Sequence, residues 1–126
     1  MYGNETILIV DDDARMCESI QGLLSNQGYA THITTTGEQA IDYLSGGVCD
    51  LILLDMMLPD MNGNTVMDYI NSKDLETLII VITGHSSEES AITSLRKGAY
   101  DYIKKPFEPD ELIKRVENAF YKKRFM

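Results

Sequence analysis

Residues 7–10 read Ile-Leu-Ile-Val and are followed at once by three aspartates at positions 11–13. Two other unbroken apolar runs of similar length occupy residues 51–54 and 78–82. Short runs of this kind are typical of parallel strands that are covered by helices on both faces. These three segments therefore predict the central strands of an α/β sheet.

Weaker patterns flank these central strands. Residues 30–34 and 99–103 mix polar and apolar side chains, as expected for the edge strands of a sheet. Between the strands, apolar residues recur at helical spacing and predict faces that pack against the sheet. These residues are Met16, Ile20, Leu23 and Leu24 in the first helix, Ile92 and Leu95 in the fourth, and Leu112, Val116 and Phe120 in the last.

Helix start and stop signals agree with this division. Two capping-box patterns are present, Thr36-x-x-Gln39 and Ser86-x-x-Glu89. Gly28 and Gly98 stand where helices should end, and Pro109 suits the first position of the last helix. The predicted order is five strand–helix units without an internal repeat or linker.

Right-handed crossovers favour a doubly wound parallel sheet for this order of elements. The apolar first, third and fourth strands belong in the middle, which gives the strand order 2-1-3-4-5 of a flavodoxin-like (βα)5 fold. Ligands bind such folds beyond the carboxyl ends of the strands, where the order reverses between the first and third strands.

Composition narrows the class of protein. The 126 residues suit one domain, residues 1–126, and 11 Lys plus Arg against 20 Asp plus Glu give a net charge of −9. This charge argues against binding of nucleic acid or anionic membranes by this domain.

The sequence also bears on the location of the protein. No apolar run can span a bilayer, no secretory signal is visible, and Cys17 and Cys49 form no CxxC pair. We therefore expect a cytoplasmic protein with reduced thiols.

Acidic residues follow two strands that should be neighbours. Asp11 and Asp12 come after the first strand, and Asp55 ends the third, so their carboxylates should converge. Such carboxylates repel one another unless a cation lies between them, and Mg²⁺ suits an incomplete shell of oxygen ligands. Thr83 and Lys105 end the fourth and fifth strands at the same edge. Asp13 is interpreted as a helix cap only.

Four stretches carry a resemblance to a known family. They are Ile-Leu-Ile-Val-Asp-Asp-Asp at 7–13, Asp-Leu-Ile-Leu-Leu-Asp-Met-Met-Leu-Pro-Asp-Met-Asn-Gly at 50–63, Val-Ile-Thr-Gly at 81–84 and Gly-Ala-Tyr-Asp-Tyr-Ile-Lys-Lys-Pro-Phe at 98–107. In order and spacing the chain resembles the receiver domain of two-component response regulators over roughly residues 6–121. The resemblance implies signalling through a phosphorylated aspartate.

The resemblance also implies roles for individual residues. Asp55 would accept the phosphoryl group from a sensor histidine kinase or phosphotransfer protein. Asp11 and Asp12 would bind Mg²⁺ together with Asp55, and Met57 would add its backbone carbonyl. Lys105, which precedes Pro106 in an expected cis peptide, would pair with the phosphoryl group.

A conformational switch is implied as well. Thr83 would donate to a phosphoryl oxygen, and Tyr102 would rotate into the space behind it. This motion would reshape the surface formed by residues 88–97, the fifth strand and the last helix, which is also a possible homodimer face. His85 lies two residues past Thr83, at a position that varies in the family and there tunes the lifetime of the phosphate; a solvated loop histidine is the alternative interpretation. Residues 60–63 are interpreted as a turn without chemistry.

Two other classes of protein stay open on the residues alone. A haloacid-dehalogenase-type phosphatase also follows a strand with Asp-x-Asp, and would use Asp11 as nucleophile and Asp13 as acid/base. It needs a further acidic pair on a later strand, and it gives Asp55 no role. An FMN-binding flavodoxin needs a Ser/Thr/Gly-rich phosphate loop, where this chain has three aspartates. The sequence is compatible with a stand-alone regulator and with a piece of a longer regulator or hybrid kinase.

Overall fold

A five-stranded parallel sheet with helices on both faces forms the fold. The computed structural model describes residues 4–84 and 88–125. The strands are β1 (Thr6–Val10), β2 (Ala30–Thr34), β3 (Leu51–Leu54), β4 (Leu78–Thr83) and β5 (Asp101–Lys104). The helices are α1 (Ala14–Asn26), α2 (Gly37–Gly46), α3 (Gly63–Ser72), α4 (Glu88–Arg96) and α5 (Pro109–Phe125).

The order of the strands is β2-β1-β3-β4-β5, and every pair is parallel. The predicted fold class and strand order are confirmed. Strands β1 and β4 are each one residue longer than the predicted runs, and β5 spans Asp101–Lys104 rather than residues 99–103. The Ala99 N–H donates to the carbonyl of Ser94 at the end of α4, so residue 99 closes the helix instead of extending the sheet.

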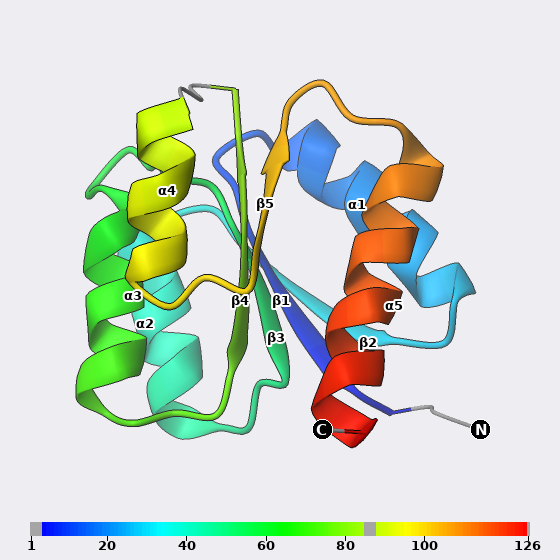
Figure 1. Ribbon diagram of the computed structural model, residues 1–126, viewed down its shortest axis with the longest axis horizontal. Helices are drawn as coiled ribbons and strands as arrows, with labels where there is room; N and C mark the ends of the chain where they lie inside the picture. Colours follow the sequence, from blue (N-terminus) through cyan, green and yellow to red (C-terminus); the bar gives the residue numbers. More distant parts are fainter. Residues whose placement is uncertain (1–3, 85–87, 126) are drawn as a thin grey trace.

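Helices α1 and α5 cover one face of the sheet, and α2, α3 and α4 cover the other (Figure 1). Side chains of β1 alternate between the two resulting cores. Ile7 and Ile9 pack with α1 and α5, whereas Leu8 and Val10 pack with α2 and α3. All four are buried, so β1 is fixed from both sides and its carboxyl end has a defined position. None of the described helices is both long and apolar enough to cross a bilayer.

Helix α4 differs from its predicted packing. The expected core-facing pair, Ile92 and Leu95, is 44% and 46% exposed, whereas Ser94 is buried. Helical spacing identifies residues that share a face, but it does not say what covers that face. Helix α4 lies beside the edge strand β5, and it turns the small Ser94 side chain inward and leaves its apolar residues outside.

Several capping predictions are confirmed. Asp13 caps α1 by accepting from the N–H groups of Arg15 and Met16. Thr36 caps α2 by accepting from the Gln39 N–H at 3.1 Å, although the Gln39 side chain accepts from the N–H of residue 35 rather than 36. Pro109 is the first residue of α5. Gly28 and Gly98 follow helices α1 and α4 with φ of 95° and 105°, a left-handed conformation that favours glycine. Ser86 and His85 lie outside the described residues.

Gly63 at the start of α3 should not tolerate a side chain. A Cβ there would lie 2.8 Å from the Met56 Cα and 2.9 Å from the Asp55 carbonyl oxygen, and neither backbone atom can move cheaply. We expect Gly63→Ala to lower the free energy of unfolding by about 1–3 kcal/mol. Gly22→Ala is the control, since a Cβ in the middle of α1 meets nothing within 4 Å and should add about 0.5–1 kcal/mol. Urea denaturation measures both, and equal effects would contradict this packing.

Candidate functional site

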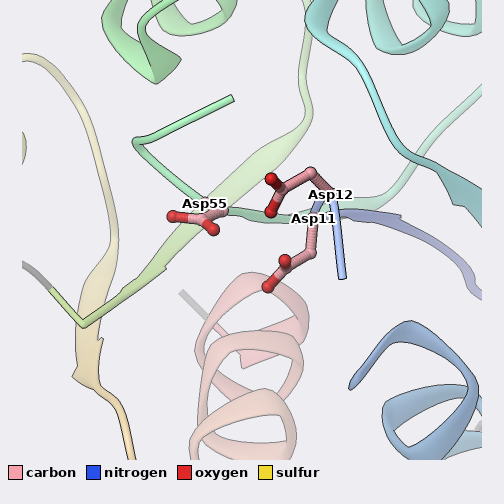
Figure 2. A group of neighbouring side chains, drawn as sticks. All are labelled: Asp11, Asp12 and Asp55. Atoms are coloured by element: carbon pink, nitrogen blue, oxygen red, sulfur yellow. The ribbon is translucent and has the colours of Figure 1, made fainter. Parts of the chain in front are cut away.

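The predicted acidic residues meet at the carboxyl ends of β1 and β3. These strands are hydrogen-bonded neighbours, and the Asp55 N–H donates to the Val10 carbonyl at 2.9 Å. On the other side of β1, the Asp11 N–H donates to the Thr34 carbonyl at 3.2 Å. The backbone thus places Asp11, Asp12 and Asp55 side by side (Figure 2), each with a carboxylate oxygen within 4.8 Å of the others.

Lys105 supplies positive charge to this acidic group. Its Nζ lies 2.6 Å from Asp11 Oδ2 and 3.3 Å from Asp55 Oδ2. Asp11 and Asp55 are only 3% and 7% exposed, while Asp12 is open to solvent. Because water screens such buried charges poorly, their electrostatic interactions are strong. One ammonium group next to three carboxylates leaves two negative charges uncompensated in the immediate group.

The pKa values of these groups follow from burial and charge. Burial raises the pKa of Asp55, and the neighbouring Asp11 charge adds to this, while the Met57 N–H and Lys105 oppose it. For Lys105, burial alone would lower the pKa, but the hydrogen bond and charge of Asp11 and the charge of Asp55 outweigh it, so its pKa is raised. Lys105 therefore stays an ammonium ion, and the raised pKa of Asp55 shows that Lys105 and the Met57 N–H do not fully offset the effect of burial.

Strand β5 leads Lys105 into the site. The Lys105 N–H donates to the Thr83 carbonyl at 2.9 Å, which joins the ends of β4 and β5. Thr83 is 1% exposed. Lys104 is exposed, in agreement with the alternation of side chains along a strand. The Lys105–Pro106 peptide bond is cis, as expected.

The loop after β3 contributes backbone groups. The Met57 N–H donates to Asp55 Oδ1 at 3.1 Å, which orients the carboxylate, while the Met57 side chain is exposed. The Gly63 N–H closes the loop on the Met56 carbonyl at 2.8 Å. An open cavity of about 480 Å³ lies above the site and is lined by Asp12, Asp55, Met57, Leu58, Pro59, Gly84 and Lys105.

Tyr102, the expected switch residue, lies on β5 and is partly buried. Its ring packs against the core on the side of α2 and α3. Its backbone carbonyl lies 3.5 Å from Arg115 Nη1 of α5, and the same guanidinium pairs with Asp101 at 2.6 Å. Tyr102 thus connects the sheet edge with the elements on either side of it.

The residues present fit Mg²⁺. The cluster offers only oxygen ligands, in a group with uncompensated negative charge and an open side toward solvent. Mg²⁺ prefers such hard ligands, and it retains waters that a phosphate oxygen can replace. The side chains of Asp11, Asp12 and Asp55 could therefore hold this ion.

Comparison with known proteins identifies the family. The family model described as the response regulator receiver domain matches residues 7–117. The chain belongs to the receiver-domain family of response regulators. A receiver domain is a signalling domain, and family members typically carry a Mg²⁺ site and an acceptor aspartate. The phosphatase alternative is not supported by these comparisons.

Relatives and solved structures agree with this assignment. The chain is 40% identical over 110 residues to the transcriptional regulatory protein DltR of Streptococcus agalactiae, covering 87% of this chain and 49% of DltR. It is 37% identical over 112 residues to the response regulator SaeR of Staphylococcus aureus, covering 89% and 49%. The chain spans about half the length of these curated relatives. A CheY-like receiver domain from Methanospirillum hungatei superposes with a TM-score of 0.90 at 29% identity, covering 97% of this chain and 98% of that domain.

Sequence reasoning missed one feature near the site of the receiver domain. Residues 60–63 were interpreted as a simple turn, yet Asp60 accepts hydrogen bonds from the N-terminus of α2, and Asn62 caps α3. Asp and Asn are common helix caps, which was the available signal. The partner of Asp60 lies 23 positions away in the sequence, and no local pattern indicates such a distant contact.

Proposed function

We propose that this receiver domain accepts a phosphoryl group on Asp55, in a Mg²⁺-dependent reaction, from a sensor histidine kinase or a phosphotransfer protein in the cytoplasm. The observation that carries the proposal is the position of Asp55. Its carboxylate belongs to the acidic group that suits a divalent cation, lies 3.3 Å from the Lys105 ammonium and lines an open cavity.

In the proposed reaction, a carboxylate oxygen of Asp55 attacks phosphorus and the bond to the donor's histidine nitrogen breaks. The leaving imidazole keeps the electron pair and takes up a proton from solvent. Phosphoryl transfer needs an in-line nucleophile and positive charge around the equatorial oxygens. When bound by Asp11, Asp12, Asp55 and the Met57 carbonyl, Mg²⁺ would supply part of that charge.

The chain's own residues would supply the remaining interactions. The Met57 N–H holds one oxygen of the Asp55 carboxylate and thereby restricts its rotation. Lys105 would exchange its contact with Asp55 for one with a phosphoryl oxygen, and Thr83 would donate a hydrogen bond to another. Water would later cleave the acyl phosphate. The catalysis that we propose is limited to the domain's own phosphorylation and dephosphorylation.

We further propose that phosphorylation changes the surface formed by α4, β5 and α5. Inward movement of Thr83 would leave space for the Tyr102 ring, which lies on the neighbouring strand. Ile92 and Leu95 expose apolar surface on α4. Burial of such surface favours association, so the same face is proposed as a homodimer interface. The phosphoryl group must favour one state of the switch, since equal affinity for both shifts nothing.

The acceptor assignment predicts a single labelled residue. Acetyl phosphate with Mg²⁺ should add one phosphoryl group, about 80 Da as estimated from its composition, because a small donor can reach the open site. Asp55→Asn should abolish the addition. Asp13→Asn should leave the extent of labelling unchanged, because Asp13 is a helix cap and Asn caps helices about as well as Asp. Intact-mass spectrometry measures the product, and labelling of Asp11 or unchanged labelling of Asp55→Asn would contradict the assignment.

The switch predicts long-range changes with a phosphoryl mimic. Beryllofluoride with Mg²⁺ should shift backbone amide resonances at residues 83–105, and sedimentation velocity should show more dimer. Thr83→Ala should uncouple both effects and preserve metal-induced shifts near Asp12 and Asp55, because it removes only the link to β5. Shifts confined to the loops around Asp12 and Asp55 in the wild type would show an acceptor site without this switch.

A further inference from the structure

Asp60 joins the loop after β3 to a different helix. Its two carboxylate oxygens accept hydrogen bonds from consecutive backbone N–H groups at the start of α2, from Gly37 at 2.8 Å and from Glu38 at 2.9 Å. These two donors lower the pKa of Asp60, so the carboxylate stays charged and the contact is charge-assisted. The positive end of the helix dipole favours the same charge.

The side chain of Met61 packs against the backbone of Gly37, next to the hydrogen bonds of Asp60. A Cβ on Gly37 would lie 2.4 Å from both Cγ and Sδ of Met61, so the bare glycine backbone lets the loop tip lie directly against α2. Gly37 is buried at this contact. The loop tip therefore meets the helix through two adjacent residues, one by hydrogen bonds and the other by packing.

This contact completes a closed chain of hydrogen-bonded links that joins the end of β1, the start of α2 and the loop after β3. The Asp55 N–H bonds to Val10, which precedes Asp11, and the Asp11 N–H bonds to Thr34, which leads into α2. Asp60 then connects α2 back to the loop that begins at Asp55. Without the Asp60 link, the loop is still held by the Met57–Asn62 bridge, by the Gly63 N–H on the Met56 carbonyl and by the packing of Met61. Its tip, however, loses both hydrogen bonds to α2.

We propose that Asp60 is a positioning residue that fixes the loop carrying the Met57 carbonyl relative to Asp11 and Asp12. The inference rests on the proposed Mg²⁺ site and adds a residue that touches neither the metal nor the phosphoryl group. We call the two hydrogen bonds from α2 to Asp60 the tether. If the tether is lost, metal binding must order the loop tip, and the loss of conformational entropy makes binding weaker. Partners outside the ligand shell typically change metal affinity in this way.

The chain offers a matched control for this test. Thr36 caps the same helix, but its hydroxyl accepts from the Gln39 N–H within α2 and makes no link to the loop. Thr36→Ala and Asp60→Asn both weaken the start of α2. Only Asp60→Asn also weakens the link to the loop, because Asn is uncharged and its single side-chain oxygen takes the place of two acceptor oxygens. Asp60 is exposed, so its replacement by the isosteric Asn should leave the fold intact.

Calorimetric titration of the metal-free proteins with MgCl₂ should show about tenfold weaker binding for Asp60→Asn. This is the smallest loss of metal affinity that is typical when a residue outside the ligand shell is replaced. Binding by Thr36→Ala should stay within about twofold of the wild type. Without metal, amide hydrogen exchange at Met57 and Leu58 should be faster in Asp60→Asn than in Thr36→Ala, which a general weakening of α2 would not produce.

The outcomes separate the tether from the metal site itself. Wild-type protein that binds no Mg²⁺ would overturn both the proposed function and this inference. Binding by the wild type together with unchanged affinity in Asp60→Asn would overturn the tether alone. Equal weakening in both variants would assign the effect to helix α2 rather than to Asp60, and would also overturn it.

Discussion

Repulsion among carboxylates at the ends of β1 and β3 is the constraint that organises this molecule. Asp11 and Asp55 are buried, and Asp12 lies beside them, so the native chain keeps like charges close together. Lys105 reduces the repulsion by contacting two of the three carboxylates, those of Asp11 and Asp55. Burial, with a smaller contribution from the Asp11 charge, raises the pKa of Asp55 in spite of that lysine. A site of this kind has a lower free energy when a divalent cation joins it.

The rest of the fold maintains this unfavourable arrangement. Two apolar cores clamp the central strands from both faces, and the strand ends have little freedom to separate. Glycine at position 63 lets α3 start directly against the backbone of the acceptor loop. The packing of apolar side chains throughout the sheet thus offsets the repulsion between the clustered carboxylates. Natural proteins commonly accept such locally unfavourable residues at functional sites.

Much of the architecture was predictable because it depends on local patterns. The apolar runs of β1, β3 and β4 indicate buried parallel strands, and parallel strands bring residues that follow them to one edge. The strand pattern alone therefore predicts that Asp11, Asp12 and Asp55 lie together. The Asp60 contact with α2 and the outward face of α4 were not predictable, since each depends on how one element packs against another. The exposed Ile92 shows that helical periodicity alone does not identify the partner of a face.

If Mg²⁺ relieves this repulsion, the ion must also raise the free energy of unfolding. Thermal melts of the wild type and of Asp12→Asn, with and without Mg²⁺, test it directly. At a free concentration about one hundred times the dissociation constant, binding should stabilise the wild type by about 2.7 kcal/mol. Asp12→Asn should lose most of this gain, yet be at least as stable as the wild type without metal, because one repelling charge is gone. An unchanged wild-type melting temperature at millimolar Mg²⁺ would contradict the account.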